Sequence, residues 1–123
     1  MGVEEFRNAL RGRSEVELTV TGRKSGRESS RPVWFVEDDG KLFQLPVGGS
    51  NSNWYRNLVK TPTVGVAANG AEIRTEAKPI DDAAAVAEVV QRFRGRYGAD
   101  QVAAYHPTVD AAVEVPLAER TSP

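Results

Sequence analysis

The stretch Val64-Gly65-Val66-Ala67-Ala68-Asn69-Gly70-Ala71-Glu72-Ile73 contains the strongest turn signal of the chain. Asn-Gly is the dipeptide that most favours a two-residue hairpin turn, because both residues tolerate a positive φ. Val64 and Val66 precede the turn and Ile73 follows it, so apolar residues stand on both sides. The sequence therefore predicts an antiparallel hairpin whose second strand covers residues 71–78.

Similar strand patterns lie on both sides of this hairpin. Apolar and polar residues alternate over residues 16–21, and apolar runs predict further strands at 30–37, 41–46 and 113–117. Pro32 places the start of the 30–37 strand at a sheet edge or a bulge. Most connections are too short for parallel crossovers. We therefore expect a mainly antiparallel sheet that closes into a small barrel, which removes its edges.

Helical spacing of apolar residues predicts the remaining elements. The predicted helices lie at residues 3–12, after Ser52 or Asn53 as far as Pro62, from Asp81 or Asp82 to Gly98, and at 99–105. Together these patterns predict a single domain over residues 1–123. Its class is mainly β with helices (α+β), and the helices are expected at the ends of the barrel.

Composition argues against several classes of function. The 123 residues carry a formal net charge of -1, so charge alone does not indicate a nucleic-acid binder. There is no cysteine and His106 is the only histidine, so no metal site is predicted. No apolar run approaches the roughly 20 residues that span a bilayer, and no signal-peptide pattern is visible, so a cytoplasmic location is expected. Contact of the first helix with a membrane surface stays an alternative to the packing on the domain that we expect.

The first candidate site is a basic turn bounded by glycines, Gly22-Arg23-Lys24-Ser25-Gly26. The glycines let the backbone turn tightly and direct N–H groups into one concavity. Arg23 and Lys24 add positive charge and Ser25 adds a hydroxyl donor, which suits a phosphate or a carboxylate. The alternative is a solvated basic turn without a ligand. The residue order of a P-loop is absent.

The second candidate site is a small-residue loop followed by a short helix. Gly48 and Gly49 allow a ligand to approach the backbone closely. Trp54 and Tyr55 are suited to wall a flat ring, and Asn57 offers an amide that both donates and accepts. The alternative is a loop and a helix whose tryptophan simply enters the core.

Tyr105 and His106 are further candidates, near the C-terminus. Either could protonate a product or line a pocket, because imidazole titrates near neutral pH. A surface turn is the alternative for His106. No Gly-x-Ser-x-Gly elbow occurs, so hydrolysis by a protein nucleophile is not expected.

The order of these motifs resembles a known family. Leu18-Thr19-Val20-Thr21-Gly22-Arg23-Lys24-Ser25-Gly26 is similar to the Thr-x-Gly-Arg-Lys-Ser/Thr-Gly signature of the deazaflavin-dependent nitroreductase and quinone reductase family. At similar spacing follow Arg31-Pro32-Val33-Trp34-Phe35-Val36, an Asp-Gly turn, Gly48-Gly49 and Asn53-Trp54-Tyr55-Arg56-Asn57-Leu58. The resemblance covers residues 15–80, and residues 113–117 more loosely.

The resemblance implies a split β-barrel of the flavin-reductase type, like FMN-binding proteins, with reduced deazaflavin coenzyme F420 as the hydride donor. The basic turn would hold the cofactor's phosphate and acidic tail, and the Trp54 segment would flank its ring. The residues implied in cofactor binding are Gly22, Arg23, Lys24, Ser25, Gly26, Arg31, Pro32, Gly48, Gly49, Trp54, Tyr55 and Asn57. Tyr105 and His106 would lie on the substrate side.

The resemblance leaves the substrate and two other functions open. The acceptor would be a small molecule such as a quinone, a nitroaromatic or an activated enone. One alternative is an FMN-binding split-barrel protein, since FMN carries a phosphate but no acidic tail. The other is a non-catalytic module that holds a cofactor or a lipid. The oligomeric state has no signal in the sequence.

Overall fold

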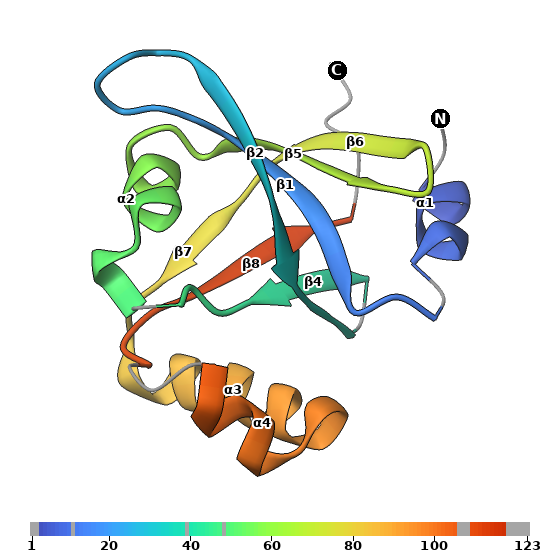
Figure 1. The fold of residues 1–123 in the computed structure, drawn as a ribbon, viewed down its shortest axis with the longest axis vertical. Helices are drawn as coiled ribbons and strands as arrows, with labels where there is room; N and C mark the ends of the chain where they lie inside the picture. Colours follow the sequence, from blue (N-terminus) through green and yellow to red (C-terminus); the bar gives the residue numbers. More distant parts are fainter. Residues whose placement is uncertain (1–2, 11, 39, 48, 106–108, 118–123) are drawn as a thin grey trace.

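The computed structural model describes the chain except for residues 1–2, 11, 39, 48, 106–108 and 118–123. Its strands form two four-stranded antiparallel sheets, with the orders β2-β1-β5-β6 and β3-β4-β8-β7 (Figure 1). The first sheet contains β1 (Glu15–Thr21), β2 (Glu28–Trp34), β5 (Thr63–Ala68) and β6 (Ala71–Glu76). The second contains β3 (Val36–Asp38), β4 (Lys41–Gln44), β7 (Lys78–Ile80) and β8 (Ala112–Pro116). The predicted α+β class and antiparallel pairing are confirmed.

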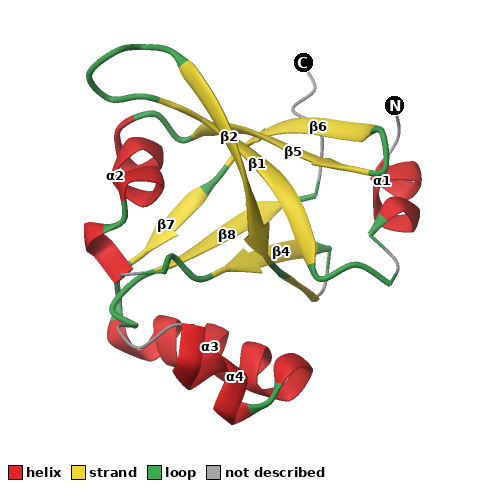
Figure 2. Ribbon diagram, in the orientation of Figure 1, coloured by secondary structure: helices red, strands yellow, loops and turns green. Residues whose placement is uncertain are grey.

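Helices surround the two sheets (Figure 2). They are α1 (Val3–Ala9), α2 (Asn53–Lys60), α3 (Ala83–Tyr97) and α4 (Ala99–Tyr105), with a 3-10 turn η1 (Gly49–Asn51) before α2. The last two pack together below the second sheet, and α2 lies beside the loop that joins β1 to β2 (Figure 1). Among the described residues, no helix is both long and apolar enough to cross a bilayer.

The Asn-Gly hairpin is present as predicted. β5 and β6 pair from Thr63 opposite Glu76 to Ala68 opposite Ala71, which leaves two residues in the turn. Asn69 has a φ of 49° and Gly70 a φ of 81°, the left-handed conformations that this turn requires.

Two predicted strands are each divided in the structure, and the divisions close the barrel. Residues 30–37 belong to β2 and β3, which are separated at Phe35, and residues 71–78 belong to β6 and β7, which are separated at Ala77. In both cases the chain leaves the first sheet and enters the second. Phe35 and Ala77 are buried at these corners. A continuous strand was therefore the wrong prediction, because apolar periodicity does not reveal a bend between sheets.

The core consists of two apolar clusters. One fills the space between the sheets, with Leu18 and Val66 fully buried in it. The other lies between the second sheet and the helices, where Phe93 of α3 packs with Phe43 of β4. Asp82 starts α3 by accepting a hydrogen bond from the Ala85 backbone N–H at 3.0 Å. The first helix ends at Ala9, three residues earlier than predicted.

Candidate functional site

The basic turn between β1 and β2 is closed by its own hydrogen bonds. The Gly22 N–H donates to the Arg27 carbonyl at 2.8 Å, and the Gly26 N–H donates to the Gly22 carbonyl at 3.0 Å. Gly26 has a φ of +72°, and a Cβ on Gly22 would lie 2.6 Å from the Ser25 hydroxyl oxygen. The positive φ thus requires glycine at position 26, whereas a side chain at position 22 would displace the Ser25 hydroxyl.

Fewer N–H groups are available in this turn than the sequence suggested. Gly22 and Gly26 use theirs inside the turn, and the Arg27 N–H donates to the Ser25 hydroxyl at 3.1 Å. Of the five turn residues, Lys24 and Ser25 keep backbone N–H groups without a partner in the described part of the chain. An anion here would be bound by side-chain charge more than by a ring of backbone donors.

The structure brings the turn into direct contact with α2. Asn57 Oδ1 accepts from the Arg23 backbone N–H at 3.1 Å and from the Arg23 guanidinium at 2.7 Å. The same guanidinium lies 3.4 Å from the Asn53 carbonyl, and Lys60 Nζ donates to the Arg23 carbonyl at 3.2 Å. The two sequence motifs therefore form one surface. Asn57, which we expected beside a cofactor ring, uses its oxygen to hold Arg23.

This surface is strongly basic. Five cationic side chains, defined here as the basic surface, come from the turn and from α2, and within the described residues none of them forms a salt bridge: Arg23, Lys24, Arg27, Arg56 and Lys60. By contrast, Arg7, Arg74 and Arg92 form salt bridges with carboxylates, such as Arg74 with Glu28 at 2.8 Å. Arg56 and Lys60 carry no local sequence signal of a site, because on a helix they resemble ordinary solvated residues.

A pocket of about 250 Å³ contains both tryptophans of the chain. It lies between the end of β2, the segment after β4 and the start of α2, and it is lined by Glu15, Pro32, Val33, Trp34, Leu45, Val47 and Trp54. Trp34 stacks on Tyr97 of α3 with ring centroids 4.7 Å apart. The Tyr97 hydroxyl in turn shares its one proton between the carbonyls of Phe35 and Ser14, the latter at 3.1 Å. We call this the tryptophan pocket.

The residues predicted to form one aromatic wall face two different pockets. Trp54 lines the tryptophan pocket, whereas Tyr55 lines another of about 370 Å³ together with Arg23, Ser50, Arg56, Val59 and Asp81. Neighbouring helical residues point about 100° apart, so the two rings cannot share a wall. Burial and the nearby carboxylates of Asp81 and Asp110 raise the pKa of Tyr55. We call this second cavity the Tyr55 pocket.

The glycine loop is held in place by Asp110, which lies just before β8. Gly49 is buried with a φ of 65°, and Gly48 lies outside the described residues. Asp110 accepts hydrogen bonds from the Ser50 backbone N–H at 2.8 Å and from the Ser50 hydroxyl at 2.6 Å. These bonds lower the pKa of Asp110. The two residues lie 60 positions apart in the sequence, so no local pattern could predict this contact.

The remaining predicted residues have different outcomes. Pro32 lies on the edge strand β2, as predicted. It also lines the tryptophan pocket. Arg31 precedes it, and its Nε is a buried donor that lacks a partner within the described residues. α4 ends at Tyr105, whose side chain is outside the described part, as is His106. Their substrate role stays a prediction.

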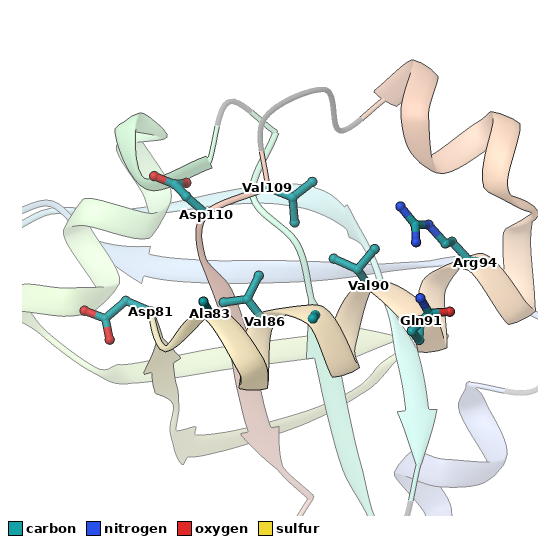
Figure 3. A pocket seen from close by; sticks show the side chains of 9 residues that line it. Asp81, Ala83, Val86, Val90, Gln91, Arg94, Val109 and Asp110 are labelled. Atoms are coloured by element: carbon teal, nitrogen blue, oxygen red, sulfur yellow. The ribbon is translucent and has the colours of Figure 1, made fainter.

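A further cavity, of about 490 Å³, lies along α3 (Figure 3). Val86, Val90 and Val109 line its apolar middle, with Asp81 and Asp110 toward one end and Arg94 toward the other. None of the residues predicted to bind a cofactor lines it.

Comparison with known proteins gives both a family and a fold. The family model described as F420H(2)-dependent quinone reductase matches residues 3–118. A solved F420-H2 dependent reductase (FDR-A) is 22% identical with a TM-score of 0.65, over 84% of this chain and 94% of that one. A structure described as a domain-swapped dimer is 24% identical with a TM-score of 0.68, over 84% and 80% of the two chains. The heme storage protein HutZ from Vibrio cholerae is 17% identical with a TM-score of 0.71, over 98% and 93%. At these identities the likeness shows a shared fold, which confirms the split barrel.

Proposed function

Because the chain belongs to the F420H(2)-dependent quinone reductase family, we propose that it binds the reduced deazaflavin coenzyme F420 and passes its hydride to a small organic acceptor. Quinones are the first acceptor class to test, followed by nitroaromatics and activated enones. The proposal rests on one observation about α2. This helix contributes Trp54 to the pocket that both tryptophans line, and it also contacts Arg23 and so forms part of the basic surface.

The tryptophan pocket suits a flat, largely apolar ring. Trp34 and Trp54 present aromatic surface from two different elements, and Pro32 and Leu45 add apolar contacts. Such rings contribute large contact area at low entropic cost because they have few rotatable bonds. Tyr97 fixes the orientation of Trp34 through stacking and its two hydrogen bonds. Trp34 is therefore held in position in the pocket by its contact with Tyr97.

The basic surface suits the anionic part of the same cofactor. Unpaired cations attract phosphate and carboxylate groups over several ångströms, and guanidinium groups can bind either in a bidentate manner. Arg31 lies on the same strand as the pocket residue Pro32, and its Nε is a buried donor without a partner within the described residues. FMN would need fewer of these charges, since it lacks an acidic tail.

The cofactor supplies a hydride from the deazaflavin C5 when it is bound. The residues of this chain bind and orient the two reactants, and no side chain needs to form a covalent bond. Leu45 and the tryptophans line one side of the ring pocket with apolar surface, which would exclude water there when a ring is bound. Catalysis would then come from holding the acceptor close to the ring in a dry site.

A fluorescence titration tests this proposal. Ligand in the tryptophan pocket should quench the emission of both indoles, so coenzyme F420 and FMN are each titrated into wild-type protein. Trp54→Leu should fold and bind coenzyme F420 roughly tenfold more weakly, because aromatic stacking contributes about 1–3 kcal/mol. A reductase assay with quinone, nitroaromatic and enone acceptors follows. Tighter binding of FMN would contradict the cofactor assignment, and binding without turnover of any acceptor would favour a carrier.

A further inference from the structure

An ion pair crosses the exposed face of the first sheet. Arg74 lies on β6 and Glu28 lies at the start of β2, and these two strands are the opposite edges of the sheet order β2-β1-β5-β6. The Arg74 guanidinium nevertheless donates two hydrogen bonds to the Glu28 carboxylate, at 2.8 and 3.3 Å. The two side chains together therefore span the strands β1 and β5 that lie between them.

Gly65 leaves the path of the arginine open. It stands opposite Arg74 in the pairing of β5 with β6, and opposite Thr19 in the pairing of β5 with β1. A Cβ built on Gly65 would lie 3.8 Å from the Arg74 Cζ, so the guanidinium passes directly over this residue. A long side chain at position 65 would occupy the place of the guanidinium.

The contact fixes Glu28 as a carboxylate. The hydrogen bonds from Arg74 and its positive charge lower the pKa of Glu28 below its usual value. The same contact raises the pKa of Arg74. Two parallel hydrogen bonds are the arrangement in which a guanidinium group binds a carboxylate most specifically. Glu28 is therefore ionised, and its charge is drawn across the sheet.

The place of Glu28 in the chain makes this contact relevant to the basic surface. Glu28 directly follows the turn of residues 22–26 and Arg27, and it is the acidic residue nearest in sequence to Arg23, Lys24 and Arg27. A free carboxylate at this position would attract these cations and repel other anions. Within the described residues, none of the three cations forms a salt bridge.

We propose that Arg74 keeps the cations of the basic surface available to an anionic ligand by holding the Glu28 carboxylate over the first sheet. Arg74 is then a positioning residue that acts through Glu28. Loss of Arg74 releases a carboxylate beside the turn, whereas loss of both partners leaves no carboxylate to release. The effect on cofactor binding rests on the proposed function, but the effect on the turn does not.

The experiment compares wild-type protein with Arg74→Gln, Glu28→Gln and the double variant. Arg92→Gln is the matched control, because it also breaks an exposed pair of an arginine with a carboxylate. Its partner is Asp38 at 2.9 Å, which lies on β3 of the second sheet. The control therefore loses the same charge and releases a carboxylate far in sequence from the turn.

Two readouts are measured on each protein. The first is the rate at which trinitrobenzenesulfonate, an anionic amine reagent, labels Lys24, followed by mass spectrometry of peptides. Lys41 is the internal reference, since it lies on β4 of the second sheet and 3.8 Å from Glu114. The second readout is the dissociation constant of coenzyme F420, from fluorescence. The first readout needs no cofactor, so it judges the inference even where the proposed function fails.

Arg74→Gln should slow the labelling of Lys24 and weaken cofactor binding, each by about twofold to fivefold, because the released carboxylate repels anions. Glu28→Gln should change both readouts little, since its carboxylate is already paired in wild-type protein. The double variant should return both readouts toward the wild-type values. Arg92→Gln should change neither, and the labelling of Lys41 should stay constant throughout.

Three results would overturn the inference. One is unchanged labelling of Lys24 in Arg74→Gln. Another is a double variant as impaired as Arg74→Gln, which would mean that the pair is only a structural brace. The third is a gain in Glu28→Gln as large as the loss in Arg74→Gln, which would indicate two independent charges. If Arg74→Gln slows labelling but coenzyme F420 binds none of the proteins, the inference stands and the proposed function fails.

Discussion

Lys24 tests the basic surface at the level of one side chain. It is exposed and makes no hydrogen bond or ion pair within the described residues, so its replacement should not disturb the turn. Lys24→Ala should weaken binding of coenzyme F420 roughly fivefold, because an exposed charge pair contributes up to about 1 kcal/mol. Turnover at saturating cofactor should change much less, since the tail lies away from the reacting carbon.

Salt dependence separates this effect from an unspecific one. Binding to wild-type protein should weaken as ionic strength rises, and the slope should be smaller for Lys24→Ala. Arg94→Gln removes the same charge from α3 and serves as the control. Equal affinity of Lys24→Ala and wild type at both low and high salt would mean that Lys24 is only a solvated turn residue.

Replacement of Gln44 should change the stability of the folded protein. It is fully buried in β4, and neither its amide nitrogen nor its amide oxygen has a hydrogen-bond partner within the described structure. Burying an unsatisfied amide costs about 1–3 kcal/mol. Gln44→Leu should therefore raise the free energy of unfolding by about 1 kcal/mol in chemical denaturation, and Gln44→Met should act in the same direction. A loss of stability in both variants would show that the amide is satisfied in solution.

At the scale of elements, the contact between η1 and the segment that precedes β8 should depend on pH. The Ser50 hydroxyl and N–H lower the pKa of Asp110 below its usual value of 3.8. A lowered folded-state pKa means that ionised Asp110 stabilises the folded protein above that usual value, and that this contribution is lost as pH falls through the lowered one.

Asp110→Asn should accordingly unfold at lower denaturant concentration than wild type at pH 7. The difference between the two proteins should shrink as the pH is reduced below about 4. Ser50→Ala should show the same trend, because it removes the hydroxyl that donates to Asp110. Asp81→Asn is the control, since Asp81 accepts no hydrogen bond from the described residues. A pH-independent difference for Asp110→Asn would rule out the charge as the cause.

The sequence predicts individual elements of the site, but it does not predict the contacts between them. The turn at residues 22–26 and the helix with Trp54 were both predictable, because glycines, charges and aromatic residues mark them locally. Their contact through Arg23 and Asn57 was not, since it joins positions 34 apart. Trp34 was assigned only to a strand, although it shares a pocket with Trp54. The packing of elements determines which side chains meet over long sequence distances. Local patterns in a single sequence do not reveal such contacts.

For the molecule as a whole, the class of fold was predictable and its closure was not. Short connections and the Asn69-Gly70 turn were sufficient for an antiparallel α+β fold. The bends at Phe35 and Ala77 divide predicted strands between two sheets. An apolar run continues through Phe35, and the alternation of buried and exposed residues continues through Ala77, so neither bend is visible in the sequence. The division of the core into two clusters follows from the same bends.

The pairing of β7 with β8 has a consequence for how this chain could be shortened. Ile80 and Ala112 lie opposite each other, so the helical segment between them leaves the sheet and returns to the same place. A tight loop could join these two ends and preserve the register of the second sheet. The segment nevertheless carries Tyr97, which orients Trp34 at the tryptophan pocket. Loss of these helices would keep the strand pairing, but it would expose the second core cluster on β4 and remove the ring that stacks on Trp34.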